Sequence, residues 1–83
     1  AGSVNFKVAI VVTAEEQGAA LAAISGAVAD MKLSITSING RYDKSNYAIV
    51  DVTVGLPSRQ DAEELISRIS SRPKILNVHR LTN

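Results

Sequence analysis

Hydrophobic and polar residues alternate along four short segments of this chain, and a period of two is typical of β-strands. Residues 5–13 form the first such segment, in which Phe6, Val8, Ile10 and Val12 fall on one face. Residues 47–54 form the clearest one, with Ala48, Val50, Val52 and Val54 on one face. Both segments are therefore predicted to be strands with one face in the core, Phe6 included.

Two further segments, residues 33–42 and 75–81, are predicted to be the second and the last strand. The alternation breaks in the second strand, because Leu33 and Ile35 share a face from which Ile38 points away unless a bulge resets the register. The polar residues 43–46 predict a turn that joins this strand to residues 47–54 as a hairpin.

The residues after Thr13 show the helical period instead and predict a helix to about Met31. Its buried stripe is predicted to consist of Leu21, Ile24, Val28 and Met31, flanked by Ala20, Ala23 and Ala27. Thr13 stands three residues before Glu16, which is the spacing of a capping box. Gly18 lies in the first turn, where glycine costs about 1 kcal/mol relative to alanine. Either close packing or backbone amides kept open for a ligand would explain it.

A second helix is predicted from Ser58, as its N-cap, to about Ser71, with Pro73 ending it. Its apolar stripe is Ala62, Leu65, Ile66 and Ile69. The element order is therefore β-α-β-β-α-β. With right-handed crossovers, this order predicts an α+β, ferredoxin-like fold: a four-stranded antiparallel sheet with both helices on one face. The first and third strands should lie in its centre.

Composition narrows the function. The 83 residues are enough for one domain, 46% of them are hydrophobic and the net charge is only +1, which predicts no strong attraction to nucleic acid or acidic membranes. The absence of cysteine fits a cytoplasmic protein, and no apolar run reaches the length of a membrane span. Residues 1–4 are expected to be a non-native or disordered start of a fragment, and residues 5–82 a single domain.

No residue pattern predicts catalysis. Glu15 and Glu16 fit the positive end of a helix dipole, Glu63 and Glu64 fit a solvated helix face, and His79 has no partner for a metal site or a base. We therefore expect no catalytic residue, no metal and no cofactor in this chain.

The sheet face without helices is predicted to be an interface, formed by Ala9, Val11, Ile38, Tyr47 and Ile49. A second copy or a neighbouring domain would cover it, and the edge strands offer pairing as another route. The RNA recognition module has the same element order, but the aromatic residues on which it stacks bases are missing here.

Residues 16–25, EQGAALAAIS, resemble the entry motif Asp-Arg-x-Gly-x-Leu-x-x-Ile-Ser of ACT domains, which are small regulatory modules. Leu21, Ile24 and Ser25 match, whereas Glu16, Gln17 and Ala19 replace Asp, Arg and Gly. Residues 33–41 and 65–80 are similar to the C-terminal ACT domain of RelA/SpoT enzymes, which make and hydrolyse (p)ppGpp. Ser37, Asn39 and the later Pro73 carry part of that resemblance, and Ser34 and Arg72 depart from it.

The resemblance implies a homodimer without enzymatic activity of its own, which regulates upstream catalytic domains of a larger enzyme. It implies a small amino acid as ligand, with branched-chain amino acids favoured, bound by the amides of Gly18, Ala19 and Ala20 and by Asn39 of the dimer mate. Two alternatives remain: the regulatory ACT domain of an amino-acid biosynthetic enzyme, or a module that contacts the ribosome and its RNA. The latter would use basic residues gathered near one end of the sheet, namely Lys7, Arg41, Lys44, Lys74 and Arg80.

Overall fold

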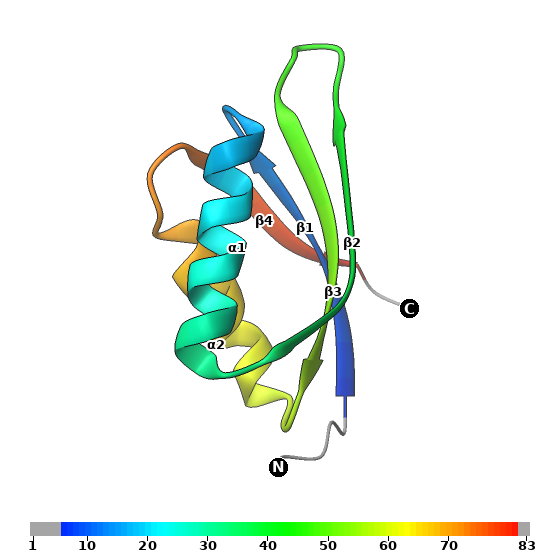
Figure 1. Ribbon diagram of the computed structural model, residues 1–83, viewed down its shortest axis with the longest axis vertical. Coiled ribbons are helices and arrows are strands. Elements are labelled where there is room, and N and C mark those ends of the chain that lie inside the picture. Colours follow the sequence, from blue (N-terminus) through cyan, green and yellow to red (C-terminus); the bar gives the residue numbers. More distant parts are fainter. Residues whose placement is uncertain (1–5, 82–83) are drawn as a thin grey trace.

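A four-stranded sheet with two helices packed on one of its faces makes up residues 6–81, the part of the chain that the computed structural model describes (Figure 1). The elements in chain order are β1 (Phe6–Ala14), α1 (Gln17–Met31), β2 (Ser34–Tyr42), β3 (Ala48–Leu56), α2 (Gln60–Ser70) and β4 (Ile75–Leu81). The strands lie in the order β2-β3-β1-β4, and all neighbours are antiparallel. The predicted ferredoxin-like fold, with the first and third strands in the centre, is confirmed. The prediction for residues 1–4 lies outside the described residues.

The core forms between the helices and the two central strands. Cross-strand partners share a face of the sheet, and the pairs Val8 with Val54, Ile10 with Val52, and Val12 with Val50 are all buried. Each such side chain stabilises the fold by about 1.5–3 kcal/mol on burial, before conformational entropy is subtracted. The faces predicted for β1 and β3 are therefore confirmed, except at the end of β1.

Phe6 is that exception. Its side chain is 38% exposed at the end of the sheet, where the Arg59 guanidinium lies 5.6 Å from the centre of the ring. The prediction that Phe6 belongs to the core is wrong, because the helices do not cover the first residue of β1.

The buried face of α1 consists mainly of alanines. Ala20, Ala23 and Ala27 are fully buried together with Ile24, whereas Leu21 is 39% exposed. Small side chains let the helix lie close to the sheet, so the helix rotates its alanines inward and leaves Leu21 at its margin. The prediction that Leu21 is in the buried stripe is therefore wrong.

The start of α1 also differs from the prediction. Thr13 lies inside β1, and Glu16 is the N-cap residue with an extended backbone (φ −148°, ψ 155°) and no side-chain capping bond. The proposed capping box is therefore wrong, because β1 continues one residue further, to Ala14, than the alternation indicated.

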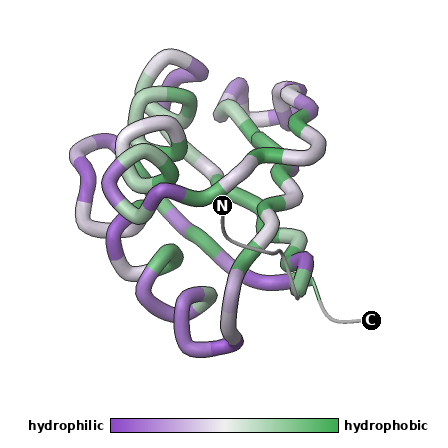
Figure 2. Tube along the Cα trace, turned by 60° about the horizontal axis from the view of Figure 1, so that its bottom comes forward, coloured by the Kyte–Doolittle hydropathy of each residue, from purple (hydrophilic) through white to green (hydrophobic). Residues whose placement is uncertain are grey.

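Helix α2 is amphipathic: Ala62, Leu65 and Ile69 recur at helical spacing and are buried. Figure 2 shows strongly hydrophobic and strongly hydrophilic residues together along it. Ser58 does not cap the backbone as predicted: Arg59 is the N-cap residue, and the Ser58 hydroxyl donates to the Asp61 carboxylate at 3.1 Å.

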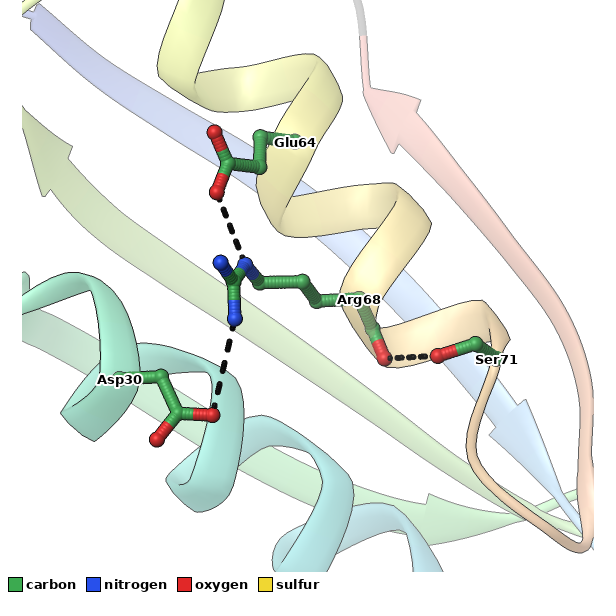
Figure 3. A network of polar contacts seen from close by, with 4 residues as sticks. All are labelled: Asp30, Glu64, Arg68 and Ser71. Atoms are coloured by element: carbon green, nitrogen blue, oxygen red, sulfur yellow. Dashed lines mark hydrogen bonds and ion pairs between the residues drawn. The ribbon is translucent and has the colours of Figure 1, made fainter.

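Arg68 joins the two helices across their outer surface (Figure 3). Its Nε donates to Glu64 Oε2 at 2.9 Å, the pair expected from their spacing of four residues, and its Nη1 lies 3.7 Å from Asp30 Oδ2 on α1. Because all three side chains are well exposed, these ion pairs contribute less than about 1 kcal/mol each.

Strand β2 is the exposed edge of the sheet. A register shift between Ile35 and Ser37 leaves Thr36 as the extra residue of a bulge, and the Thr36 hydroxyl donates to the Thr53 carbonyl at 3.2 Å. After this bulge Ile38 lies opposite Val52, on the face that carries the helices. A bulge was one explanation for the break in the alternation of this strand, and the structure has it. The prediction that Ile38 lies on the face without helices is therefore wrong.

The turn of the β2–β3 hairpin lies beyond the end of the helices (Figure 1). Asp43 Oδ1 accepts the N–H groups of Ser45 at 2.9 Å and Tyr47 at 3.0 Å, and Asn46 adopts a left-handed backbone with φ 68°. The predicted turn is confirmed, although β3 begins at Ala48 and Tyr47 still belongs to the turn.

Candidate functional site

The candidate site lies at the start of α1, where β1 ends and the chain turns into the helix. The N–H of Ala20 donates to the Glu16 carbonyl at 3.3 Å, whereas the N–H groups of Gln17, Gly18 and Ala19 have no acceptor among residues 6–81. These are the orphan donors of a helix N-terminus, at the positive end of its dipole. Ala20 is fully buried and its amide is already engaged, so only Gly18 and Ala19 of the three predicted residues can offer amides to a ligand.

Gly18 is not explained by the conformation or the packing of the chain. Its φ is not positive, and a Cβ added to it would meet no atom within 4 Å. Any residue would fit there, and alanine would favour the helix by about 1 kcal/mol. The interpretation of Gly18 as a requirement of tight packing therefore lacks support, and open space adjoins two free amides.

Gln17 is a residue of this site that the sequence reasoning missed. Its side chain crosses to β2, where its Oε1 accepts a hydrogen bond from the Tyr42 hydroxyl at 3.4 Å. Its Nε2 lies 2.6 Å from the point that a Cβ of Gly40 would occupy. A glycine inside a strand often marks such a close approach, and that is the only sequence signal that could have revealed it.

Two acidic residues stand beside these amides, and one is neutralised by a neighbouring loop. Lys74 Nζ lies 3.5 Å from Glu16 Oε1, and the Lys74 carbonyl accepts the N–H of Glu15 at 2.9 Å. Lys74 adopts a left-handed backbone with φ 68°, which is unfavourable for a residue with a side chain. The loop before β4 is thereby fixed against the start of α1.

Replacing Lys74 by glycine is expected to raise the free energy of unfolding by about 0.5–1 kcal/mol, because glycine relieves the left-handed strain and keeps the carbonyl that Glu15 binds. The lost ion pair offsets only part of this, since both partners are more than half exposed. Thermal unfolding measures the change. Lys74→Ala is the matched control: it loses the same ion pair without relief of strain, so it should be slightly less stable than the natural protein. Equal stability of the two variants would contradict this account.

Asn39 does not meet Gly18 within one chain. It pairs with Asp51 on the face of the sheet without helices, whereas α1 lies on the other face. Its position on the edge strand leaves only the predicted role toward a second copy.

The sequence matches the family model of the ACT domain over residues 2–80. The chain belongs to the ACT domain family. ACT domains are regulatory modules, and the predicted fold, order of elements and family agree.

Solved structures with the same fold come from several proteins. The ACT domain of GTP pyrophosphokinase from Chlorobium tepidum superposes with a TM-score of 0.74 at 16% identity, covering 92% of this chain and 97% of that one. The C-terminal domain of the MgtC protein from Mycobacterium tuberculosis gives 0.74 at 13% identity, covering 93% and 86%. A homoserine dehydrogenase from Thiobacillus denitrificans gives 0.66 at 23% identity, covering 90% of this chain and 16% of that one. No curated protein sequence matches.

The open face of this ACT domain is more polar than the sequence indicated. Of the predicted interface residues, Val11 is buried and Ala9 and Ile49 are partly buried, while Tyr47 is exposed in the turn. Leu81, which lies opposite Ala9, is an exposed apolar side chain on the same face. The register places polar residues around them on this face, namely Asn39, Arg41, Asp51, Thr53, Asn77 and His79, and Arg41 and Asp51 form an ion pair.

A more apolar exposed surface lies at the margin between α1 and β2. We define the β2 margin as Leu21, Ile35, Ile38 and Tyr42, all exposed on the side of the sheet that carries the helices. Ile38 is 45% exposed. Beside these side chains run the outer N–H and C=O groups of an edge strand, so the β2 margin combines apolar surface with free backbone groups.

The five basic residues do not gather at one end of the sheet. Arg41, Lys44 and Lys74 lie toward the end at which β2 turns into β3, but Lys7 and Arg80 do not. Lys7 pairs with Gly55 near one end of β3, and Lys44 lies in the turn before its other end. Lys7 and Arg80 also lie on opposite faces, since Arg80 is opposite the buried Ile10. The expected basic cluster is therefore wrong.

No three His, Cys, Asp or Glu residues within residues 6–81 are close enough to hold a metal ion. Neither of the two helices in this range has the length and hydropathy to cross a membrane.

Proposed function

We propose that this ACT domain binds a small amino acid at the start of α1 and regulates the catalytic domains of a (p)ppGpp synthetase/hydrolase. The observation that carries the proposal is Gly18, a glycine with open space beside free helix amides. The likeness to the ACT domain of a GTP pyrophosphokinase, together with the resemblance of residues 33–41 and 65–80 to RelA/SpoT enzymes, supports the choice of parent enzyme.

The ligand's carboxylate would accept hydrogen bonds from the amides of Gly18 and Ala19, where the helix dipole favours an anion. Lys74 reduces the repulsion from Glu16 by pairing with it. The exposed side chains of Leu21 and Ile38 lie next to this position along α1 and β2, and they would favour an aliphatic side chain. This combination supports branched-chain amino acids over polar ones.

A second copy would pair with the edge strand β2. Asn39 lies on this strand but on the other face from Gly18, so it cannot bind this ligand within its own chain. Pairing of β2 with β2 around a twofold axis would cover the β2 margin and satisfy the outer backbone groups of both strands, but it leaves the helices of both copies on one face and Asn39 of both on the other. The predicted contact from Asn39 of the dimer mate therefore needs a different arrangement, in which the partner turns its open face toward the start of α1. Ligand binding would then change how the two copies pack, and this change would bias the upstream catalytic domains.

A titration of the domain with valine, isoleucine, leucine and serine, followed by amide NMR, tests the proposal. We expect shifts centred on Gly18 and Ala19, with valine, isoleucine or leucine binding more tightly than serine. If the copies pair along β2, Asn39→Ala should leave binding unchanged, as should the matched control Asn77→Ala, an asparagine on the opposite edge. Weaker binding in Asn39→Ala alone would show that the partner's open face reaches the ligand. No shift at millimolar amino acid would overturn the proposal.

Replacing Ile38 by aspartate is expected to weaken the homodimer at least tenfold, because the charge would have to be buried between the two β2 margins. Sedimentation velocity over a range of concentrations measures the effect. Ile49→Asp, on the open face, is the matched control and should leave association unchanged. The reverse result would place the dimer on the open face.

The fold likeness to a homoserine dehydrogenase favours a second candidate, the regulatory ACT domain of an amino-acid biosynthetic enzyme. Both candidates predict amino-acid binding. Assay of the full-length parent for (p)ppGpp synthesis and hydrolysis separates them, since only the first predicts that the amino acid changes these activities.

A further inference from the structure

The side chain of Gln17 reaches from the first residue of α1 to two positions on the edge strand. Its Oε1 accepts the hydroxyl of Tyr42 at 3.4 Å, and its Nε2 lies over Gly40. Gly40 and Tyr42 are opposite Val50 and Ala48, so both belong to the face on which the helices pack. One amide group thus spans the seam between the helix layer and β2.

Few other contacts hold residues 38–42 of β2 against the helices. All nine residues of β2 are exposed, and so is Leu21 on the facing side of α1. Within residues 6–81, the contact between Gln17 and Tyr42 is the one hydrogen bond or ion pair that joins α1 to β2. The hairpin beyond it projects past the end of the helix (Figure 1).

Gly40 is what permits this contact. Glycine in a strand interior weakens the strand, and Gly40 does not have a positive φ that would require it. A Cβ at this position would come within 2.6 Å of Gln17 Nε2, closer than two such atoms can approach. Because Nε2 is the end of a flexible side chain, the Gln17 amide would have to shift away from β2 if any other residue stood at position 40.

We propose that Gln17 is a latch that couples the start of α1 to the turn-side half of the β2–β3 hairpin. Its regulatory meaning rests on the proposed function, because the amides of Gly18 and Ala19 follow Gln17 directly. A ligand on these amides moves the latch, and the latch moves the strand at which a second copy pairs. Gln17 acts here as a positioning residue between two surfaces.

Hydrogen exchange of the ligand-free domain tests the latch by itself. In Gln17→Ala we expect the amides bonded between residues 38–42 and 48–52 to exchange about fivefold faster relative to those of β1, the factor that corresponds to one net hydrogen bond. Gly40→Ala should give a smaller change in the same direction, because the new methyl forces the end of the Gln17 side chain to shift. Tyr42→Phe should give a smaller change in the same direction.

The double variant Gln17→Ala/Gly40→Ala is decisive. Once the glutamine amide is gone the methyl has room, so the double variant should exchange no faster than Gln17→Ala alone. Gly18→Ala is the matched glycine control, since a Cβ there meets nothing, and it should leave exchange of the hairpin unchanged. Effects of Gln17→Ala and Gly40→Ala that simply multiply, or no effect of either, would overturn the latch.

The valine titration then tests transmission separately. If valine shifts the amides of Gly18 and Ala19, Gln17→Ala should keep those shifts and lose the accompanying shifts of residues 40–42. Retained shifts at 40–42 would overturn the latch. If none of the amino acids in the titration binds the natural domain, the proposed function fails, and the latch is decided by the exchange experiment alone.

Discussion

Replacing Ile24 by alanine is expected to lower the free energy of unfolding by about 2–5 kcal/mol. Ile24 is fully buried on the face of α1 that packs on the sheet. The other buried residues of this face are three alanines and the smaller Val28. Because those alanines already hold the helix close to the strands, the helix cannot collapse far into the cavity that the truncation leaves. Chemical denaturation of the purified domain measures the loss.

Leu21→Ala is the matched control for this experiment. It removes a side chain of the same size from the same helix, but one that is 39% exposed. We expect a loss of less than about 1 kcal/mol, since little buried surface disappears and alanine favours the helix. A larger loss from Leu21→Ala than from Ile24→Ala would show that Leu21, and not Ile24, carries the packing of α1 on the sheet.

Replacing Gly18 by valine is expected to weaken amino-acid binding about a hundredfold, which corresponds to about 2.7 kcal/mol of binding free energy. The branched side chain would occupy the open space through which a carboxylate reaches the amides of Gly18 and Ala19. Stability should change by less than about 1 kcal/mol, because the new side chain meets no atom of its own chain. Isothermal titration and thermal unfolding of the same preparation measure the two quantities.

The contrast between binding and stability makes this prediction specific. Ser25→Val places the same side chain on an exposed position two turns along the same helix, and it should leave binding unchanged. Unaltered affinity in Gly18→Val would move the ligand away from the start of α1. A large loss of stability would show instead that Gly18 is needed for packing.

The strands and the order of elements could be predicted because they depend on local alternation. In β3, four apolar residues lie on one face, while Asp51 and Thr53 accompany Ile49 on the other. This pattern favours the register that buries the first face, and the structure has that register. The bulge in β2 was visible as a break in the same pattern. Such features need only a few neighbouring residues, and these a sequence shows directly.

The helix positions that were predicted wrongly depend on contacts between layers. Leu21 fits the helical period, but the alanines of α1 rotate the helix so that Ile24 and Val28 face the sheet without it. Thr13 has the spacing of a cap, but pairing with Ile49 and Asn77 keeps it in the sheet. In both cases packing and strand pairing outweigh a local preference.

Only part of the candidate site could be predicted from the sequence. Gly18 could be singled out because glycine is costly in a first helical turn, whereas Gln17 could not, because its partners Gly40 and Tyr42 stand 23 and 25 positions away. The part that Ala20 was expected to take is lost to a backbone hydrogen bond within the helix start. Contacts between distant segments are what a single sequence leaves undetermined.

The strand order β2-β3-β1-β4 gives the sheet two unlike edges, and this has a consequence for the size of any assembly. If β2 of one copy pairs with β2 of another, the β2 edges of both copies are covered. Pairing through β2 then stops at two subunits, related by a twofold axis. If β2 paired with β4, each added copy would present a fresh edge, and the subunits would build a ring or an open filament. The choice of partner strand therefore decides whether this mode of pairing stops at two copies.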